Sequence, residues 1–124
     1  PRGGDEINAI TAGKNYGWPL ITYGKNYIGT SIGPSESEGL EQPLVYWNPS
    51  VSPSGMAFVN DGQNQSLLLA CLSDRIIKKL TMKNGKVVDQ QALFEEPKMR
   101  FRHVAQSPGK RIYFSTDDGK IYRL

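Results

Sequence analysis

The sequence predicts an all-β fold, and three observations lead to this prediction. Thirteen glycines and eight prolines are spread along the 124 residues, which argues against long helices. No stretch combines apolar residues at helical spacing with capping residues at both ends. Short apolar or alternating runs, bounded by Gly, Asn, Asp and Pro, recur instead. We therefore expect short strands joined by tight turns, as in a sandwich, a barrel or a propeller.

The first half of the chain predicts fewer and weaker elements. Its expected strands are 7–11, 20–23, 44–47 and 55–59, the first two being weak. Residues 24–42 are rich in Gly, Ser, Glu and Pro and are expected to form a long surface loop. The strand 55–59 is expected to end at the turn Asn60-Asp61-Gly62.

The second half is more regular. Its expected strands are 66–72, 76–82, 87–94, 102–106, 111–115 and 120–124. Asn84-Gly85 and Asp118-Gly119 are strong hairpin turns, and Ser107-Pro108-Gly109 is a further turn. Strand spacing and turn chemistry indicate one propeller blade over 56–94 and another over 104–124, although no strict sequence repeat is present.

Length limits the chain to one domain at most. A propeller needs at least about four blades to close, and this chain holds about two and a half to three. We therefore expect part of a ring, from a fragment or a processed chain that opens at Pro1 without a visible signal peptide. No apolar run approaches the ~18 residues of a spanning helix, so membrane insertion is not expected.

The charge and the cysteine content of the chain argue against nucleic-acid binding and an internal disulfide. Fifteen basic against twelve acidic residues give a net charge of +3, a mild and scattered excess that does not indicate nucleic-acid binding. The single cysteine, Cys71, excludes an internal disulfide and is expected to be a buried thiol.

The opening stretch Arg2-Gly3-Gly4-Asp5-Glu6 is the first candidate site. Glycines allow the backbone to turn its carbonyls inward, and Asp5 or Glu6 can add a carboxylate oxygen. A calcium ion or another polar ligand suits such a loop. The alternative is a solvated loop capped by acidic side chains.

Segments along nearly the whole chain resemble one family. They are Asp5-Glu6-Ile7-Asn8, the run 13–19 (Gly-Lys-Asn-Tyr-Gly-Trp-Pro), Glu41-Gln42-Pro43 with Val45-Tyr46-Trp47, and the runs 49–58, 99–104 and 112–117. In this order and spacing they are similar to the soluble quinoprotein sugar dehydrogenases, the glucose/sorbosone dehydrogenase family, with PQQ-dependent aldose sugar dehydrogenases as its closest members. The resemblance implies that residues 1–124 are the C-terminal part of a single six-bladed β-propeller domain.

The same resemblance implies a function. Members hold PQQ and calcium over the ring and oxidise the anomeric hydroxyl of aldoses to lactones, passing electrons to an external acceptor. The implied location is periplasmic or secreted, and a homodimer is left open. The family's base, a His from the N-terminal half, is outside this chain, so we assign no catalytic residue and expect the fragment alone to be inactive. The rival interpretation is a non-catalytic extracellular propeller that has lost its cofactor and serves as an interaction module.

Arg100 and Arg102 are the expected cofactor-binding pair. Residues two apart in a strand point to the same face, so both guanidiniums can reach one ligand. Arg binds carboxylates in bidentate fashion, and PQQ carries three of them beside its ortho-quinone. The resemblance implies that this element lies against the cofactor. The alternative from the motif alone is a solvated strand face.

Further site residues follow from the resemblance only. Ser50 falls near a cofactor-contacting hydroxyl, and Trp47 matches an aromatic beside the sugar, although a core Trp is equally consistent. Pro1 matches a residue whose carbonyl binds the cofactor's calcium, while Glu6 and the carbonyl of Tyr16 match ligands of a second, structural calcium.

Two positions depart from the family's pattern. Ser73 stands where members often place a cofactor-contacting Lys, so binding is weakened unless Arg75 substitutes. His103 stands where relatives usually carry Asp; we expect it to be a polar strand residue, although proton abstraction is chemically open to it. Acyl transfer is not expected, because the chain has one His and no Gly-x-Ser-x-Gly elbow.

Overall fold

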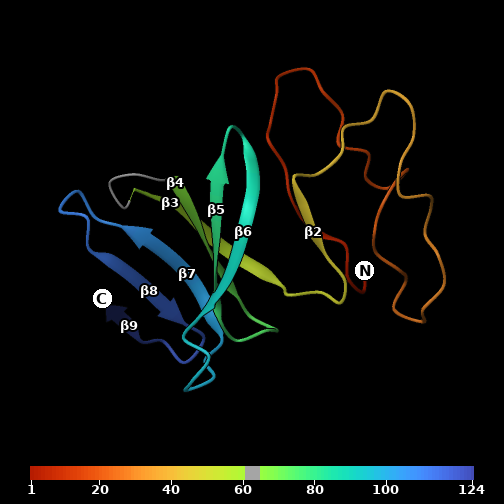
Figure 1. The fold of residues 1–124 in the computed structure, drawn as a ribbon. Helices are drawn as coiled ribbons and strands as arrows, with labels where there is room; N and C mark the ends of the chain where they lie inside the picture. Colours follow the sequence, from red (N-terminus) through yellow and green to blue (C-terminus); the bar gives the residue numbers. More distant parts are fainter. Residues whose placement is uncertain (61–64) are drawn as a thin grey trace. The chain divides into compact units, whose positions relative to one another are not determined.

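The computed structural model describes residues 1–60 and 65–124, which divide into two compact units, Pro1–Val51 and Ser52–Leu124. All regular secondary structure in these residues is β-strand, which confirms the predicted fold class (Figure 1). Nothing in these ranges forms a helix long and apolar enough to cross a membrane. The predicted turn at Asn60-Asp61-Gly62 falls largely outside the described residues.

The C-terminal unit begins with a four-stranded antiparallel sheet in the order β3-β4-β5-β6 (Figure 1). Its strands are β3 (Pro53–Asn60), β4 (Gln65–Cys71), β5 (Ile77–Lys83) and β6 (Lys86–Leu93). Asn84 and Gly85 join β5 to β6 with φ angles of 51° and 72°. Two positive φ values are what a type I′ hairpin requires, so the predicted turn and the predicted blade over 56–94 are confirmed.

A three-stranded antiparallel sheet follows, in the order β7-β8-β9. Its strands are β7 (Phe101–Gln106), β8 (Ile112–Thr116) and β9 (Ile121–Arg123). Residues 107–109 and 117–119 form the connecting turns where the sequence predicts them. The register of β7 against β8 shifts between Phe101 and His103, which marks a bulge at the start of β7.

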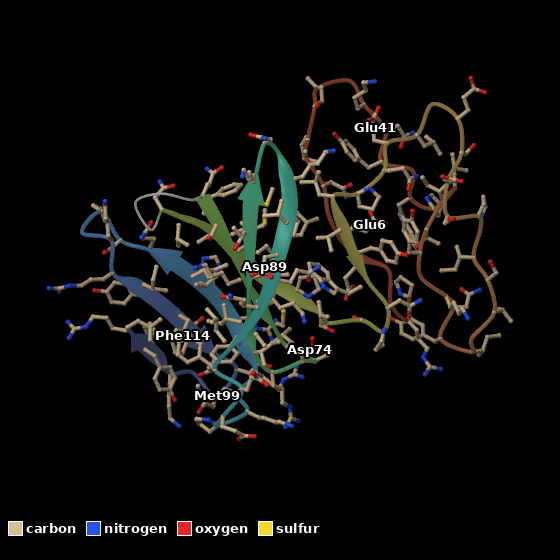
Figure 2. All side chains as sticks on the ribbon, in the orientation of Figure 1. Glu6, Glu41, Asp74, Asp89, Met99 and Phe114 are labelled. Carbon is tan, nitrogen blue, oxygen red and sulfur yellow. The ribbon has the colours of Figure 1, made fainter. Side chains whose placement is uncertain are left out.

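The core of this unit lies between the two sheets. Its buried apolar side chains are Val59, Leu68, Ala70, Ile77, Phe101, Val104 and Phe114. Strand β4 is buried from Ser66 to Cys71, which explains why its sequence is continuously apolar rather than alternating. Cys71 is fully buried, as predicted. Phe114 lies on the second sheet (Figure 2). Its ring lies 5.2 Å from that of Phe101 and 5.1 Å from that of Tyr122, so aromatic packing joins the three strands of this sheet.

The N-terminal unit has little regular structure. Only β1 (Asp5–Ile7) and β2 (Val45–Trp47) form strands, and they pair with each other. The strand predicted at 44–47 is confirmed, and 24–42 is a loop with isolated bridges at Lys25 and Ser31.

The strands predicted at 7–11 and 20–23 are wrong. The first strand ends at Ile7, and Ile10 is 77% exposed. The backbone N–H groups of Leu20 and Ile21 both donate to the carbonyl of Gly17, so this segment closes a turn instead of extending. Leu20 is exposed, and Ile21 is buried from within this turn rather than from a strand face.

Backbone hydrogen bonds hold these loops together. The N–H of Gly4 donates to the carbonyl of Trp47 (2.7 Å), and Arg2 and Lys25 exchange two backbone hydrogen bonds. Gly4 has φ = 77°, and a Cβ there would lie 2.4 Å from the backbone nitrogen of Gly24. Only glycine permits this close approach of two chain segments.

Candidate functional site

One end of the C-terminal unit gathers three chain segments. These segments are the residues after the end of β4, the residues before the start of β7 and the turn after β8. Hydrogen bonds join them: the Nη1 of Arg100 donates to the carbonyl of Leu72 (3.5 Å), and the N–H of Asp117 donates to the carbonyl of Arg100 (3.0 Å). We call this end of the unit the cationic rim, and we define it by Arg75, Lys98, Arg100, Arg102 and Asp117.

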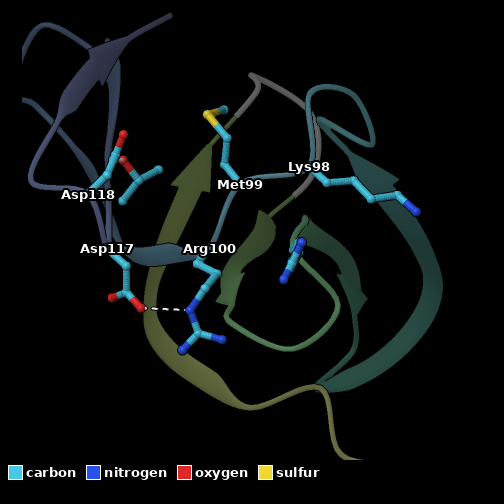
Figure 3. Close-up of a pocket in the computed structure, with 7 residues that line it drawn as sticks. Lys98, Met99, Arg100, Asp117 and Asp118 are labelled. Carbon is cyan, nitrogen blue, oxygen red and sulfur yellow. Dashed lines mark hydrogen bonds and ion pairs between the residues drawn. The ribbon is translucent and has the colours of Figure 1, made fainter.

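Arg100 and Arg102 bind one carboxylate, that of Asp117. The Nε of Arg100 lies 2.8 Å from its Oδ2 (Figure 3). The Nε and Nη2 of Arg102 lie 2.7 and 2.5 Å from its Oδ1. These hydrogen bonds from Arg100 and Arg102 lower the pKa of Asp117 below its ordinary value. Arg100 lies just before β7 and Arg102 lies within it, on either side of the buried Phe101, so both side chains leave the backbone on the face opposite that of Phe101, as strand alternation predicts.

A pocket of about 320 Å³ opens beside this ion pair (Figure 3). Its lining residues are Arg75, Lys98, Met99, Arg100, Thr116, Asp117 and Asp118. The sequence did not identify Asp117 as a site residue, because no pattern pairs it with arginines that lie fifteen and seventeen positions earlier. The pocket is polar and charged, and it suits an anionic ligand better than an apolar one.

Ser73 and His103, the two positions that depart from the family's pattern, each have defined neighbours in the structure. The Oγ of Ser73 lies 2.5 Å from the Oγ of Ser52, so this hydroxyl is engaged within the unit. Two residues later, Arg75 lines the pocket. His103 is exposed on β7 and packs over Gly55, where a Cβ would lie 2.4 Å from its Nδ1. That placement agrees with a polar strand residue.

The N-terminal unit has a pocket of its own, of about 260 Å³. Its lining residues are Pro1, Gly4, Glu6, Tyr16, Trp18, Ile21 and Thr22. The three residues that the resemblance assigned to two calcium ions, Pro1, Glu6 and Tyr16, thus line one pocket. Glu6 is on β1, which pairs with β2 (Figure 2), and Tyr16 comes to the same pocket from the loop that follows β1.

Oxygen donors surround Glu6. Its Oε2 accepts a hydrogen bond from the Nδ2 of Asn8 (3.2 Å), and the Oδ1 of Asn8 is buried with no hydrogen bond among the described residues. A buried acceptor without a donor beside a carboxylate suits a hard cation. The described ranges contain no cluster of three or more His, Cys, Asp or Glu, so a cation here would depend on amide and backbone oxygens.

The side chain of Tyr16 has a structural task. Its hydroxyl donates to the carbonyl of Ala9 (2.7 Å) and accepts from the N–H of Thr11 (2.7 Å). The hydroxyl therefore fixes the 9–16 loop, and only the backbone carbonyl of Tyr16 fits the role of a metal ligand.

Ser50 and Trp47 lie in the same unit. The Oγ of Ser50 donates to the Oδ2 of Asp5 (2.6 Å), which also accepts from the N–H of Val51 (2.8 Å). Trp47 is half-buried on β2, opposite Asp5. Trp18, which is not among the predicted site residues, is 60% exposed and lines the pocket with Glu6.

Comparisons with known proteins agree with this architecture. The family model for "Glucose / Sorbosone dehydrogenase" matches residues 1–123. The aldose sugar dehydrogenase YliI of Escherichia coli K12 is 39% identical over 125 residues, which is 95% of this chain and 34% of the relative. The chain therefore spans about a third of the length of such relatives.

Solved structures give the same result. A crystal structure of a glucose dehydrogenase superposes with a TM-score of 0.89 at 40% identity, over 99% of this chain and 38% of that one. The PQQ-bound form of an aldose sugar dehydrogenase from Streptomyces coelicolor superposes with a TM-score of 0.73 at 26% identity, over 96% and 35%. The β-propeller assignment is thereby confirmed, and the chain belongs to the glucose/sorbosone dehydrogenase family.

Proposed function

We propose that the full-length protein is a PQQ- and calcium-dependent oxidoreductase that oxidises the anomeric hydroxyl of aldoses to lactones. The observation that carries the proposal is the convergence of Arg100 and Arg102 on one carboxylate, together with similarity to a PQQ-bound relative. When bound, PQQ supplies the two-electron acceptor for this oxidation. This chain would bind and orient the cofactor.

The arginine pair fits the cofactor's carboxylates. Each guanidinium has five N–H donors in a planar fork, and Asp117 uses only part of them. The remaining donors can bind a carboxylate of the ligand in a charge-assisted, bidentate manner. Asp117 would hold both side chains in place before the ligand arrives, which reduces the entropy lost on binding.

Calcium binding belongs to the N-terminal unit in this proposal. The carbonyl of Pro1 would bind the cofactor's calcium, and the carboxylate of Glu6 and the carbonyl of Tyr16 would bind a second, structural calcium. The buried Oδ1 of Asn8, beside Glu6, is a further oxygen of the kind that Ca²⁺ prefers. Ser50 would contact the cofactor, and Trp47 would pack against the sugar ring. The base that removes the hydroxyl proton would come from elsewhere in the protein, so this chain alone is not expected to catalyse.

The proposal extends to partners and location. Electrons would leave to an external acceptor, and the protein would act in the periplasm or outside the cell, with no nucleic-acid or membrane partner. A homodimer is compatible with the proposal.

Dye-linked oxidation of several aldoses by the full-length protein tests this function. The apoprotein is reconstituted with PQQ and Ca²⁺, and the variant Arg100→Ala/Arg102→Ala is compared with Arg111→Ala, which removes an exposed cation outside the pocket. We expect sugar-dependent dye reduction in the wild type and the Arg111 variant and its loss in the double variant. A folded wild type that reduces no dye with any aldose contradicts the proposal.

One observation favours a second candidate, a non-catalytic extracellular interaction module. Ser73, which replaces the lysine often found in the family, offers no charge, and its hydroxyl is engaged with Ser52. If the folded protein binds no PQQ, this candidate takes the place of the first.

A further inference from the structure

The two acidic residues that line the pocket, Asp117 and Asp118, are already partnered. Asp117 binds Arg100 and Arg102, and the Oδ2 of the neighbouring Asp118 lies 2.7 Å from the Nζ of Lys120. Neither carboxylate is therefore left to neutralise a further cation that lines the pocket.

Arg75 is such a cation. It lines the pocket with Arg100 and Asp117, and its side chain has no hydrogen bond or ion pair to any residue in the described ranges. Its backbone has φ = 59°, a left-handed conformation that is uncommon for a residue with a side chain. Residues held in this conformation cluster at ligand-binding sites.

The rim therefore has an excess of positive charge. The rim holds three arginines, Arg75, Arg100 and Arg102, and one carboxylate, that of Asp117, which binds Arg100 and Arg102. Lys98 does not add to this group, because its side chain extends away from the Arg100–Asp117 pair (Figure 3). An excess of two guanidinium charges beside a pocket of about 320 Å³ fits a compact ligand with more than one carboxylate.

We propose that Arg75 is a third carboxylate-binding residue of this pocket and that it binds a carboxylate of PQQ other than those held by Arg100 and Arg102. This inference rests on the proposed function. It also supplies a cation two residues from Ser73, the position at which the resemblance implies a lysine.

The test is a titration of PQQ into the full-length apoprotein at saturating Ca²⁺, followed by the change in protein fluorescence. Arg75→Gln removes the charge and keeps most of the side chain, Arg75→Lys restores the charge, and Arg111→Gln is the matched control. We expect Arg75→Gln to weaken binding by roughly 10- to 100-fold, the worth of one charge-assisted contact. Arg75→Lys should recover part of this loss, and Arg111→Gln should bind as the wild type does.

A second ligand separates binding from a structural effect. The trimethyl ester of PQQ lacks all three carboxylate charges, so the wild type and Arg75→Gln should bind it alike. Equal weakening of acid and ester by Arg75→Gln overturns the inference, since the residue would then act on the fold. Urea unfolding midpoints of all variants verify that they are folded.

Two further outcomes distinguish this inference from the proposed function. If the wild type binds PQQ and Arg75→Gln binds it equally well, the inference is overturned and the proposed function stands. If the folded wild type binds no PQQ, both are overturned.

Discussion

The two units of the chain are stabilised in different ways. In the C-terminal unit, apolar strands bury a continuous core, with Phe101, Ile77, Leu80 and Val104 fully excluded from solvent. In the N-terminal unit, two three-residue strands and a network of backbone hydrogen bonds fix long loops. The stability of the C-terminal unit depends on the packing of buried side chains, whereas that of the N-terminal unit depends on backbone conformation at a few glycines.

This difference extends to the ligands that each unit can bind. Rigid strand ends in the C-terminal unit position guanidiniums, which suits a planar, anionic cofactor. Loops in the N-terminal unit present carboxylate, amide and backbone oxygens around Glu6, which suits a calcium ion with its flexible coordination. Mutations that act on one unit alone can therefore test whether the two units bind different ligands.

The largest effect is expected from Phe101→Ala. Phe101 is fully buried, and its ring contacts those of Phe94 and Phe114. Removing a buried aromatic ring leaves a cavity and costs about 3–5 kcal/mol. Urea unfolding of the full-length protein measures this loss. Val88→Ala, at a position that is 57% exposed, is the control and should change the free energy of unfolding by less than about 0.5 kcal/mol.

A smaller effect is expected from Gly4→Ala in the N-terminal unit. The substitution combines a left-handed φ of 77° with a clash against the backbone of Gly24, and we expect a loss of roughly 2–3 kcal/mol. Gly13→Ala is the matched control, because Gly13 has a similar φ of 76° but open space around it. It should lose only about 1 kcal/mol in the same unfolding experiment. Equal losses would show that strain, and not the close approach of the chains, dominates there.

The same contrast explains what the sequence predicts well. All six strands predicted between 66 and 124 are present, with ends within two residues, because alternation, continuous apolar runs and Asn-Gly or Asp-Gly turns act locally. In the first half, Ile10 and Leu20 resemble strand residues but are exposed. Their loops are fixed by hydrogen bonds such as that from Glu41 to Asn15, which no local pattern reveals.

The residues of the candidate site also differ in how far the sequence predicts them. The Arg100–Arg102 pair is visible in the sequence because the two residues lie close together. Asp117, which joins them, and Arg75, which shares their pocket, come from other strand ends and meet the pair only in the folded sheet. In the N-terminal unit, the sequence offers Asp5 as a metal ligand or as a carboxylate that caps a loop, whereas its hydrogen bond with Ser50 depends on a contact across forty-five residues.

The smallest effect concerns pH. Arg100 and Arg102 lower the pKa of Asp117, so the ionised carboxylate stabilises the fold above its unfolded-state pKa of about 3.9. This contribution is lost as the pH falls through the lower, folded-state pKa. We expect the wild type to unfold at a higher temperature than Asp117→Asn at pH 6 and the two to converge toward pH 2.5. A difference in unfolding temperature that stays constant across this range contradicts the ion pair.

The central claim is that the N-terminal unit binds Ca²⁺ and the C-terminal unit binds PQQ. Its most direct test is a pair of calorimetric titrations of the full-length protein, one with Ca²⁺ and one with PQQ at saturating Ca²⁺. Glu6→Gln should weaken the binding of Ca²⁺ and leave that of PQQ unchanged. Arg100→Ala/Arg102→Ala should weaken the binding of PQQ by about 100-fold or more and leave that of Ca²⁺ unchanged. If the arginine variant binds PQQ like the wild type, the cationic rim does not hold the cofactor and the account is wrong.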